Sequence, residues 1–326
     1  MSDATVVGAG VAGLWAAREL LARGLRPRIL DRAGPPGPHC CSWWAGGMLA
    51  PDCEGATADP AALVRGRGAA RAWAGVTKVA RRGTLVLAPE RDRSDLDAFA
   101  RRAGGHVQVD GEEIARLEPD LAARHRRGLF FRGEAHLDPR RALADLANGL
   151  AAEGVCIERE DVRPGDVAGP VVDCRGLAGR DALPGLRAVR GEMIVLRSSE
   201  ISLSRPVRLL HPRHPLYVAP RGEGLFMLGA TQIESESPSG ITARAALELM
   251  SSAYALDPRF GEAEIVEMGA DLRPAFPDNA PRIVLRGRIL HLNGLFRHGY
   301  LMAPALARQA AAYLAAGEKG DLIHED

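Results

Sequence analysis

The stretch ATVVGAGVAGLWAARELLARGLRPRILDR, residues 4–32, decides the fold that we expect for this chain. Its apolar start leads into glycines at positions 8, 10 and 13, the pattern Gly-x-Gly-x-x-Gly, and then into apolar residues at helical spacing. Gly24 suits the end of that helix, and a second apolar run reaches Asp31, 23 residues after Gly8. The stretch therefore predicts a strand, a tight turn, a helix and a second strand, as at the start of a Rossmann-like α/β domain.

Each part of this pattern has a role in binding a dinucleotide. Gly8 permits the tight turn, Gly10 lets the backbone approach a pyrophosphate, and Gly13 allows the helix to pack closely on the strand. The helix N-terminus offers free N–H groups, and Asp31 can accept hydrogen bonds from a ribose diol. An ordinary glycine-rich turn is the alternative, but the flanking strand and helix favour a dinucleotide site. The pattern does not separate FAD from NAD.

Composition excludes several classes of protein. The chain has 326 residues, 46% of them hydrophobic, which predicts two domains. A net charge of +1 without a basic stripe argues against nucleic acid as a partner. Lys78 and Lys319 are the only lysines, and neither lies in a convincing motif, so Schiff-base chemistry with pyridoxal phosphate is not expected.

The sequence gives no sign of a membrane-spanning helix, a disulfide framework or a metal site. No apolar run reaches the ~18 residues of a spanning helix, and no signal-peptide pattern precedes Ala4, so we expect a soluble cytoplasmic protein. The five cysteines are odd in number and two of them are adjacent, which argues against disulfides in that compartment. They contain no C-x-x-C pair, so no metal site is expected.

The segment that follows the nucleotide-binding motif leaves two interpretations open. Residues 40–51, CCSWWAGGMLAP, combine small residues and paired glycines with large aromatics. Such backbone could lie against a flat ligand, with Ser42 bonded to a phosphate or ribose. The two tryptophans could equally serve only to cover the core.

The remaining elements predict a discontinuous cofactor domain with a second domain built on mostly antiparallel sheet. We expect strands at 84–88, 106–109, 129–131, 134–137, 155–157, 170–174, 192–196, 216–218, 225–229 and 288–292, and helices at 60–75, 94–103, 140–153, 243–254 and 303–316. Pro304 is expected near the start of the last helix. The predicted FAD-binding domain comprises residues 1–78, 138–186 and 262–326, and the predicted substrate domain comprises 79–137 and 187–261.

Three separated segments together resemble the D-amino-acid oxidase (DAO) family of FAD-dependent oxidoreductases. They are the N-terminal GAGVAG with Asp31, the segment AGGMLAP at 45–51, and the C-terminal pair LRPAFPDNAP at 272–281 and GLFRHGYLMAP at 294–304. Within the family, the chain is most similar to the glycine oxidases of thiamine biosynthesis. The resemblance covers most of the chain in the same order.

The resemblance implies FAD, held without a covalent bond because no cysteine lies beyond Cys174. It also implies contacts of Val162 with adenine and of the last glycine-rich loop with the flavin ring. Together with Gly8, Gly10 and Gly13, the residues that it assigns to FAD are Val11, Ala12, Asp31, Arg32, Cys41, Ser42, Gly46, Gly47, Met48, Val162, Gly176, Leu295, Phe296, Arg297, His298, Gly299, Tyr300 and Leu301.

The resemblance also assigns three catalytic residues. Arg273 falls where the family holds the substrate carboxylate, because a guanidinium pairs with a carboxylate through two parallel hydrogen bonds. Tyr217 matches a tyrosine whose hydroxyl assists, and Arg297 matches a second arginine. From the residues alone, Arg273 could be a surface charge, Arg297 part of a salt bridge at the domain interface, and Tyr217 a half-buried strand aromatic.

The implied reaction is oxidative deamination of glycine or another small amine. A hydride passes from Cα to flavin N5, the imine product is hydrolysed or handed to a thiazole synthase, and O2 is reduced to H2O2. A D-amino-acid or sarcosine oxidase or dehydrogenase is an alternative, as is a flavin-binding partner protein without turnover. The chain departs from the family pattern at Gln232, at Tyr300 and in the short region 52–83, so substrate identity stays open. A homo-oligomer is compatible with these features.

Overall fold

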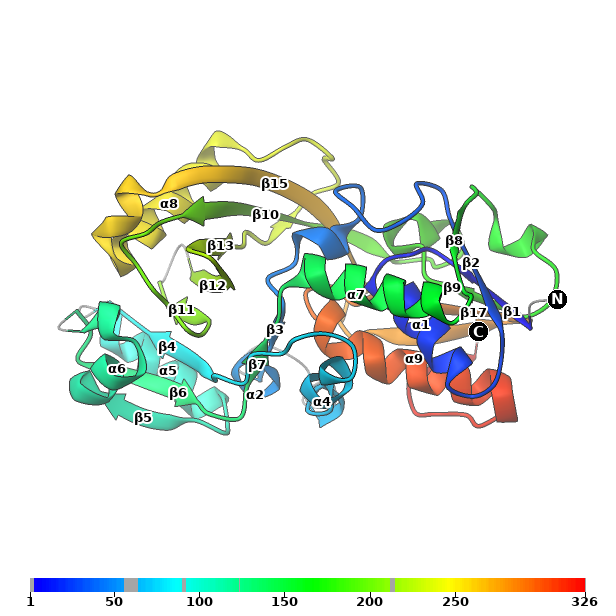
Figure 1. Cartoon of the computed structure of the whole chain (residues 1–326), viewed down its shortest axis with the longest axis horizontal. Coiled ribbons are helices and arrows are strands. Elements are labelled where there is room, and N and C mark those ends of the chain that lie inside the picture. Colours follow the sequence, from blue (N-terminus) through cyan, green and yellow to red (C-terminus); the bar gives the residue numbers. More distant parts are fainter. Residues whose placement is uncertain (1–2, 56–63, 90–91, 123, 212–214, 326) are drawn as a thin grey trace.

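A computed structural model describes residues 3–55, 64–89, 92–122, 124–211 and 215–325. Two large β-sheets dominate it and lie at opposite ends of the molecule (Figure 1). The first contains both ends of the described chain and the second is built from its middle. This arrangement confirms the predicted α/β fold.

The first sheet has seven strands in the order β18-β16-β17-β9-β1-β2-β8. β1, β2, β8, β9 and β17 run parallel, whereas β16 is antiparallel to β17. The strands are β1 (Ala4–Val7), β2 (Pro27–Asp31), β8 (Ile157–Arg159), β9 (Val171–Asp173), β16 (Arg282–Arg286), β17 (Ile289–Asn293) and β18 (Ile323–Glu325).

Three helices pack together beside this sheet and supply most of its core. α1 (Val11–Leu21) contacts both α7 (Pro139–Ala152) and α9 (Gly299–Ala316). Leu14, Trp15 and Leu20 of α1 are almost fully buried, as the helical spacing of its apolar residues predicts. Asp138 caps α7 by accepting hydrogen bonds from the first backbone amides, which explains why that helix begins at Pro139.

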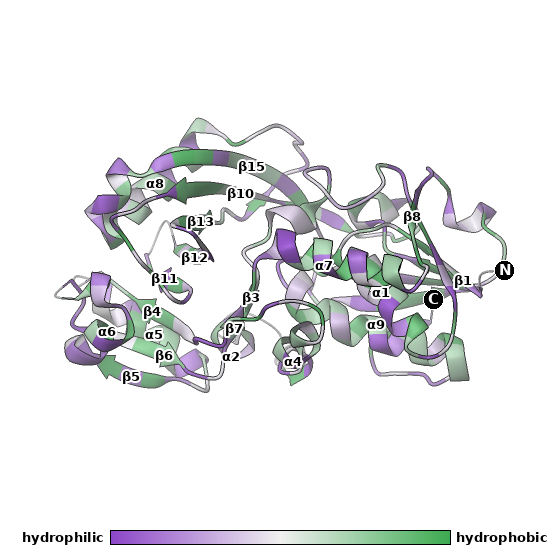
Figure 2. Cartoon of the chain, in the orientation of Figure 1, coloured by the Kyte–Doolittle hydropathy of each residue, from purple (hydrophilic) through white to green (hydrophobic). Residues whose placement is uncertain are grey.

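The second sheet has nine strands in the order β14-β10-β13-β12-β11-β4-β6-β5, with β15 on the other side of β10. Only the pair β4–β11 is parallel. The strands are β4 (Thr84–Leu87), β5 (Val107–Asp110), β6 (Arg127–Phe131), β10 (Arg187–Arg197), β11 (Val207–Leu209), β12 (Leu216–Gly222), β13 (Leu225–Gly229), β14 (Ile233–Glu234) and β15 (Glu264–Ala275). Figure 2 shows that inner strands such as β4 and β10 are mostly hydrophobic.

Short elements connect the two sheets and cover the second. β3 (Met48–Leu49) pairs with β7 (Ala135–His136) between them. The other helices are α2 (Pro51–Glu54), α4 (Ala69–Ala74), α5 (Arg93–Arg102), α6 (Gly111–Leu117) and α8 (Ala243–Leu256). The 3-10 turns are η1 (Cys41–Trp44), η3 (Pro119–Leu121), η4 (Pro164–Asp166), η5 (Gly176–Asp181) and η6 (Pro258–Glu262).

Most predicted elements are confirmed within one or a few residues, but six of the described strands were not predicted, namely β3, β11, β14, β15, β16 and β18. β15 and β16 have no clean alternation of apolar and polar residues, and β15 contains Arg273 and Pro274. The predicted strand 155–157 occurs two residues later, as β8. Residues 60–63 of the predicted helix 60–75 lie outside the described residues, and α4 forms its last part.

The predicted domain boundaries stay a prediction. β15 lies in a range assigned to the FAD-binding domain, yet it pairs with β10 in the second sheet. Figure 1 shows these two long strands curving side by side from the first sheet region to the far end of the second. Any boundary near residue 262 therefore separates two strands that are joined along their whole length.

The last helix differs from the prediction. α9 begins at Gly299, so Pro304 lies inside the helix and not near its start. A proline at this position cannot donate to the carbonyl of Tyr300, four residues earlier. Trp73 replaces the missing donor, because its indole Nε1 donates to that carbonyl at 2.8 Å. The indole also stacks on the ring of Tyr300, with centroids 5.3 Å apart. A distant side chain thus makes the internal proline tolerable.

Among the described residues, no helix combines the length and the hydrophobicity that crossing a bilayer requires.

Replacing Trp73 tests this compensation. Trp73→Phe should lower the free energy of unfolding by about 2–4 kcal/mol, because it removes both packing volume and the indole that donates to the carbonyl of Tyr300. In a Pro304→Ala background the loss should shrink by about 1 kcal/mol, since an alanine amide at position 304 can bond the same carbonyl. Urea unfolding of the four proteins gives the coupling, and strict additivity would contradict this account.

Candidate active site

A cavity of about 700 Å³ lies where the two sheets meet. Residues at or just after the ends of β1, β2, β9 and β17 line it, namely Gly8, Arg32, Cys174 and Asn293 with Leu295. Parallel strands end at one edge of their sheet, and ligands of such folds bind outside that edge. The opposite wall comes from β10, β12 and β15 of the second sheet. The cavity is therefore built from segments far apart in the chain.

Nearly all predicted site residues line this cavity. They are Gly8, Gly10, Val11, Ala12, Asp31, Arg32, Cys41, Ser42, Gly46, Gly47, Met48, Gly176, Tyr217, Arg273, Leu295, Phe296, Arg297, His298, Gly299, Tyr300 and Leu301. Gly13 does not line the cavity but packs against the glycine turn. A Cβ at Gly13 would fall 1.8 Å from the carbonyl oxygen of Gly8. Val162 follows β8, is half-buried and does not line the cavity, so its contact with adenine stays a prediction.

The N-terminus of α1 forms one end of the cavity. Ser42 accepts a hydrogen bond from the amide of Val11 through its Oγ at 3.1 Å. Leu14 is the first residue whose amide bonds within the helix, so the amides of Ala12 and Gly13 have no intrahelical acceptor. The carboxylate of Asp31 accepts the amide of Ala9 at 2.8 Å, which fixes it beside the glycine turn. A helix end of this kind, with an acid beside it, suits a diphosphate and a ribose.

The segment 40–51 combines both interpretations that the sequence left open. Trp43 packs against the core of the first sheet, with the guanidinium of Arg140 4.6 Å from its ring centre. Trp44 lines the cavity and lies over Gly269 of β15. Gly46 also lines it, and a Cβ there would fall 2.8 Å from the ring of Tyr217. One tryptophan therefore covers the core, and the other faces the ligand cavity.

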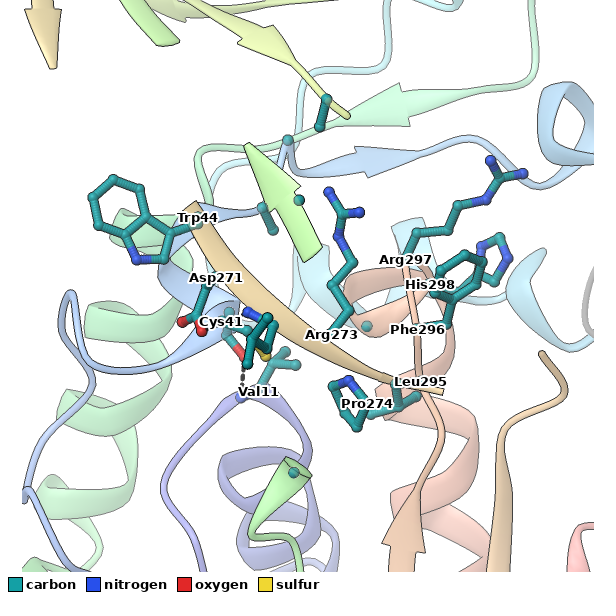
Figure 3. A pocket seen from close by; sticks show the side chains of 18 of the residues that line it. Val11, Cys41, Trp44, Asp271, Arg273, Pro274, Leu295, Phe296, Arg297 and His298 are labelled. Atoms are coloured by element: carbon teal, nitrogen blue, oxygen red, sulfur yellow. Dashed lines mark hydrogen bonds between the residues drawn. The ribbon is translucent and has the colours of Figure 1, made fainter. Parts of the chain in front are cut away.

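Arg273 projects into the cavity from β15 (Figure 3). Its side chain crosses β10 at Gly191, where a Cβ would fall 2.0 Å from Nη2. Nη1 donates to the carbonyl oxygen of Thr231 at 3.1 Å. Among the described residues, no carboxylate lies within ion-pair distance of this guanidinium. Burial lowers the pKa of Arg273, while the nearby hydroxyl of Tyr217 opposes that effect. Arg273 thus brings a positive charge to the cavity without an ion pair among the described residues, although the carboxyl of Asp271 attracts it.

Tyr217 reaches the same part of the cavity from β12. Its hydroxyl lies between two glycines, since a Cβ at Gly229 would fall 2.3 Å from it and one at Gly46 3.1 Å. Burial raises the pKa of Tyr217. The phenol is therefore neutral near pH 7 and can donate a hydrogen bond.

Arg297 differs from Arg273, because it is already paired. Its Nη2 lies 2.7 Å from Oε2 of Glu54, and Arg208 approaches Oε1 of the same carboxylate at 3.1 Å. Although burial opposes ionisation of Glu54, these two guanidiniums lower its pKa. Burial lowers the pKa of the adjacent His298 to about 4, so this imidazole is neutral near pH 7. The salt-bridge alternative for Arg297 is thus observed, and its predicted contact with substrate stays a prediction.

Sequence reasoning missed Glu54, Arg208 and Asp271, which also line the cavity. Asp271 lies on β15 two residues before Arg273, and burial raises the pKa of its carboxyl. Arg208 could have been suspected as the one charge in β11, between the buried Val207 and Leu209. No local pattern distinguishes Glu54 in the short helix α2.

Comparison with protein families agrees with this geometry. The model of the DAO family, described as FAD dependent oxidoreductase, matches residues 3–313. This chain belongs to the DAO family. The predicted cofactor FAD is thereby confirmed, and the chain is an enzyme of the FAD-dependent oxidoreductase class.

Individual relatives narrow the similarity of this DAO-family chain. The putative thiamine biosynthesis oxidoreductase ThiO of Rhizobium etli is 53% identical over 95% of this chain and 95% of its own length. The glycine oxidase of Pseudomonas aeruginosa is 28% identical over 96% of this chain and 94% of its own. The crystal structure of glycine oxidase from Geobacillus kaustophilus has a TM-score of 0.82 at 23% identity, covering 98% of this chain and 96% of that one, which shows the same fold. The predicted resemblance is confirmed.

The cavity fits FAD at several points. The start of α1 and Asp31 suit its diphosphate and ribose, as described above. Gly46 and Gly47 keep the backbone of segment 40–51 free of side chains, and a Cβ at Gly47 would fall 2.1 Å from the carbonyl of Leu137. In the last loop, Phe296 has a φ of 48°, and its amide donates to the carbonyl of Pro274 at 2.9 Å. A left-handed phenylalanine is strained and occurs where a binding loop is held in one shape.

The buried carboxyl of Glu134, which lies near Glu54, makes the free energy of unfolding depend on pH. Glu134 is 1% exposed, and its Oε1 accepts the amide of Cys53 at 2.6 Å. Burial raises the pKa of Glu134 to about 8, with a contribution from Asp52 and Glu54. A carboxyl with a raised pKa binds its proton more tightly in the folded chain. Its stabilising contribution is complete below pH about 4.5 and is lost as the pH rises through about 8.

Glu134→Gln should therefore stabilise the protein at high pH only. Relative to wild type, its free energy of unfolding should rise by about 2–4 kcal/mol between pH 5 and pH 8.5, because one pKa unit corresponds to about 1.4 kcal/mol. Glu153→Gln, at an exposed position after α7, is the matched control and should show no such trend. Urea unfolding across this range measures both, and a pH-independent difference for Glu134→Gln would contradict the assignment.

Proposed function

We propose that this protein oxidises the carbon–nitrogen bond of glycine and other small amines to an imine. The observation that carries the proposal is the half-buried guanidinium of Arg273, which faces the cavity without a carboxylate partner among the described residues. A planar carboxylate is the group that a guanidinium fork pairs with best. The similarity to a glycine oxidase and to a ThiO-type oxidoreductase supports an amino-acid substrate.

Arg273 and Tyr217 divide the work of holding the substrate. Arg273 binds the carboxylate, and the neutral hydroxyl of Tyr217 donates a further hydrogen bond to it. With the carboxylate fixed at one point, Cα has one orientation toward the cofactor, and orientation is the main contribution that a protein makes to such chemistry. FAD, when bound, supplies the electron acceptor and passes two electrons to O2, which gives H2O2.

No side-chain base is required in this proposal. The substrate ammonium loses its proton to water, and the neutral amine is the reactive form. His298 belongs to the last loop, but it is buried near Glu54, burial lowers its pKa to about 4, and it forms part of the cavity wall. The product imine is hydrolysed to a 2-oxo acid and ammonia, or it is passed on before hydrolysis.

The size of the cavity favours small substrates. A volume of about 700 Å³ has to hold both FAD and the substrate, and single drug-sized ligands commonly fill much of such a volume. Tyr217 and Gln232 line this cavity together with Arg273. Glycine and sarcosine fit this space better than bulky D-amino acids.

The biological setting forms part of the same proposal. The name of the Rhizobium etli relative places that protein in thiamine biosynthesis. We propose that the imine made by this chain is consumed by a thiazole synthase in the cytoplasm, with FAD bound non-covalently.

Replacing Arg273 tests the assignment directly. Arg273→Ala should lower kcat/KM for glycine by about 30–1000-fold, mostly through KM, because a lost charged hydrogen-bond partner costs about 2–4 kcal/mol. The variant should keep its FAD absorbance. Arg308→Ala, exposed on α9, is the matched control and should behave as wild type. Wild-type kinetics in Arg273→Ala would rule out this residue as the carboxylate site.

A substrate panel with peroxide detection tests the reaction itself. We expect turnover of glycine and sarcosine to exceed that of D-phenylalanine, because FAD and the substrate share one cavity of about 700 Å³. Anaerobic glycine should bleach the visible absorbance of the bound FAD. If the protein prefers bulky D-amino acids, the proposed function changes to that of a D-amino-acid oxidase. If no amine bleaches the FAD, only the role of a flavin-binding partner protein is left.

A further inference from the structure

The segment between β13 and α8, residues 230–242, forms one wall of the cavity near Arg273. Thr231, Gln232, Ile233 and Pro238 of this segment line the cavity. Only Ile233 and Glu234 form a strand, β14, and the residues from Ser235 to Thr242 have no regular structure. A wall of this kind needs an anchor to keep a defined shape.

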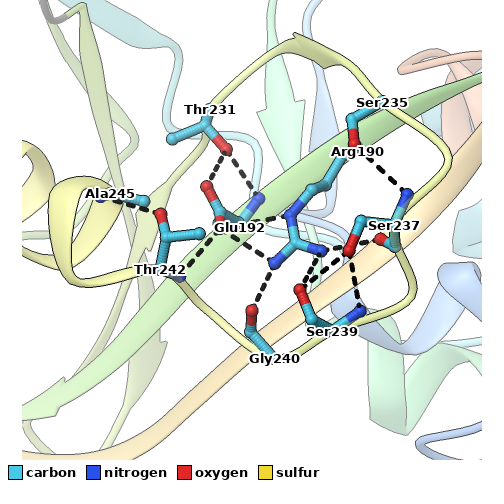
Figure 4. Close-up of polar contacts among 9 residues, drawn as sticks. All are labelled: Arg190, Glu192, Thr231, Ser235, Ser237, Ser239, Gly240, Thr242 and Ala245. Carbon is cyan, nitrogen blue, oxygen red and sulfur yellow. Dashed lines mark hydrogen bonds and ion pairs between the residues drawn. The ribbon is translucent and has the colours of Figure 1, made fainter.

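Two charged residues of β10 provide that anchor (Figure 4). Arg190 is 2% exposed and Glu192 is fully buried, and Nη2 of the arginine lies 3.0 Å from Oε1 of the glutamate. Burying an ion pair is costly and commonly adds little net stability, so apolar residues could have filled these positions as well. The pair therefore calls for an explanation beyond core packing.

Arg190 holds the far half of the segment. Its Nη1 donates to the carbonyl oxygen of Ser237 at 2.7 Å and to Oγ of Ser239 at 3.1 Å, and its Nη2 donates to the carbonyl oxygen of Gly240. These contacts draw the chain over the surface of β10. One guanidinium thus provides donors for the carbonyl groups of Ser237 and Gly240, which do not belong to a strand.

Glu192 holds both ends of the segment. Its Oε1 accepts the amide of Thr242 at 2.9 Å, and its Oε2 accepts the hydroxyl of Thr231 at 3.0 Å. The same hydroxyl accepts the backbone amide of Glu192 at 3.0 Å, and the amide of Thr231 donates to the carbonyl of Glu192. Thr231 is therefore fixed by its side chain and by its backbone.

The fixed residue Thr231 in turn contacts Arg273. The carbonyl oxygen of Thr231 accepts a hydrogen bond from Nη1 of Arg273 at 3.1 Å, the one hydrogen bond of that guanidinium among the described residues. Neighbouring residues of a strand face opposite sides, so Gly191 leaves room for Arg273 on one side of β10 while Arg190 and Glu192 lie on the other. The orientation of the guanidinium thus depends on the position of a single carbonyl group.

We propose that Arg190 and Glu192 are positioning residues, which hold segment 230–242 and, through the carbonyl of Thr231, set the orientation of Arg273 for a substrate carboxylate. The inference rests on the proposed function, because it assumes that Arg273 binds that carboxylate. A pair that served stability alone would leave carboxylate affinity unchanged once the protein is folded.

The test uses acetate, a carboxylate without an amine, titrated by calorimetry into the FAD-loaded enzyme and its variants. Thr231→Val keeps the shape of the side chain but loses both hydroxyl contacts with Glu192. It should bind acetate about tenfold more weakly and raise KM for glycine similarly, with a smaller change in kcat, because a lost hydrogen bond of this kind costs roughly a factor of ten. Thr231→Ser keeps the hydroxyl and should restore wild-type affinity.

Two further variants keep the test decisive. Glu192→Gln removes the charge that Thr231 and Arg190 share and should weaken acetate binding in the same direction. Ser235→Ala removes only a contact within the segment, the acceptor for the amide of Ser237, and should bind acetate as wild type does. Thermal unfolding of each protein, measured beforehand, separates a folding defect from an effect on affinity.

The outcomes distinguish this inference from the function on which it rests. If Arg273→Ala loses acetate binding but Thr231→Val and Glu192→Gln keep it, the positioning role is overturned and the proposed function stands. If Ser235→Ala weakens acetate as much as Thr231→Val does, the effect belongs to the segment in general and the inference also fails. If Arg273→Ala binds acetate normally, both the proposed function and the inference fail.

Discussion

The architecture of the site depends on one electrostatic constraint, a half-buried guanidinium that lacks a carboxylate neighbour among the described residues. Removing a charge from water is costly, and most buried arginines recover that cost through an acid. Arg297 and Arg208 do so through Glu54, and Arg190 does so through Glu192. Among the described residues, Arg273 donates to the carbonyl of Thr231 and lies near Tyr217 and Asp271, but it forms no ion pair with a carboxylate. The site of Arg273 is therefore suited to an incoming anion, whereas the sites of these three paired arginines are not.

The strand pair β10–β15 maintains this arrangement. The two strands pair from Arg187 with Ala275 to Arg197 with Glu264, so that β15 holds Arg273 at the cavity while its other end forms an exposed edge of the second sheet. β10 contributes Gly191 beneath the guanidinium and the ion pair on its other side. The strand pair β10–β15 thus connects segment 230–242 with Arg273. A small displacement of either strand would change the position of the guanidinium.

Local patterns predicted those parts of the fold whose causes are local. The glycine turn, α1 and β2 were predicted because spacing, capping and turn geometry act over a few residues. β15 and β16 were missed, since their mixed composition becomes a strand only through pairing with β10 and β17. The start of α9 was misplaced because the donor that satisfies the carbonyl opposite Pro304 comes from Trp73, far away in the sequence. Glu54 carried no local signal at all, as its partners lie on other elements.

The sequence by itself determined the Rossmann-like opening, the FAD-type motif and the position of Arg273 in a recognisable family pattern. Tertiary structure alone decided that Arg297 is paired with an acid and that Arg273 is not, because charge pairing joins residues such as Arg297 and Glu54 that no spacing rule connects. It also decided that Asp31 turns back onto the amide of Ala9 and that Tyr217 lies between Gly46 and Gly229. The physical reason is one of range: helix and turn preferences act between near neighbours in the chain, whereas burial and electrostatics act between neighbours in space.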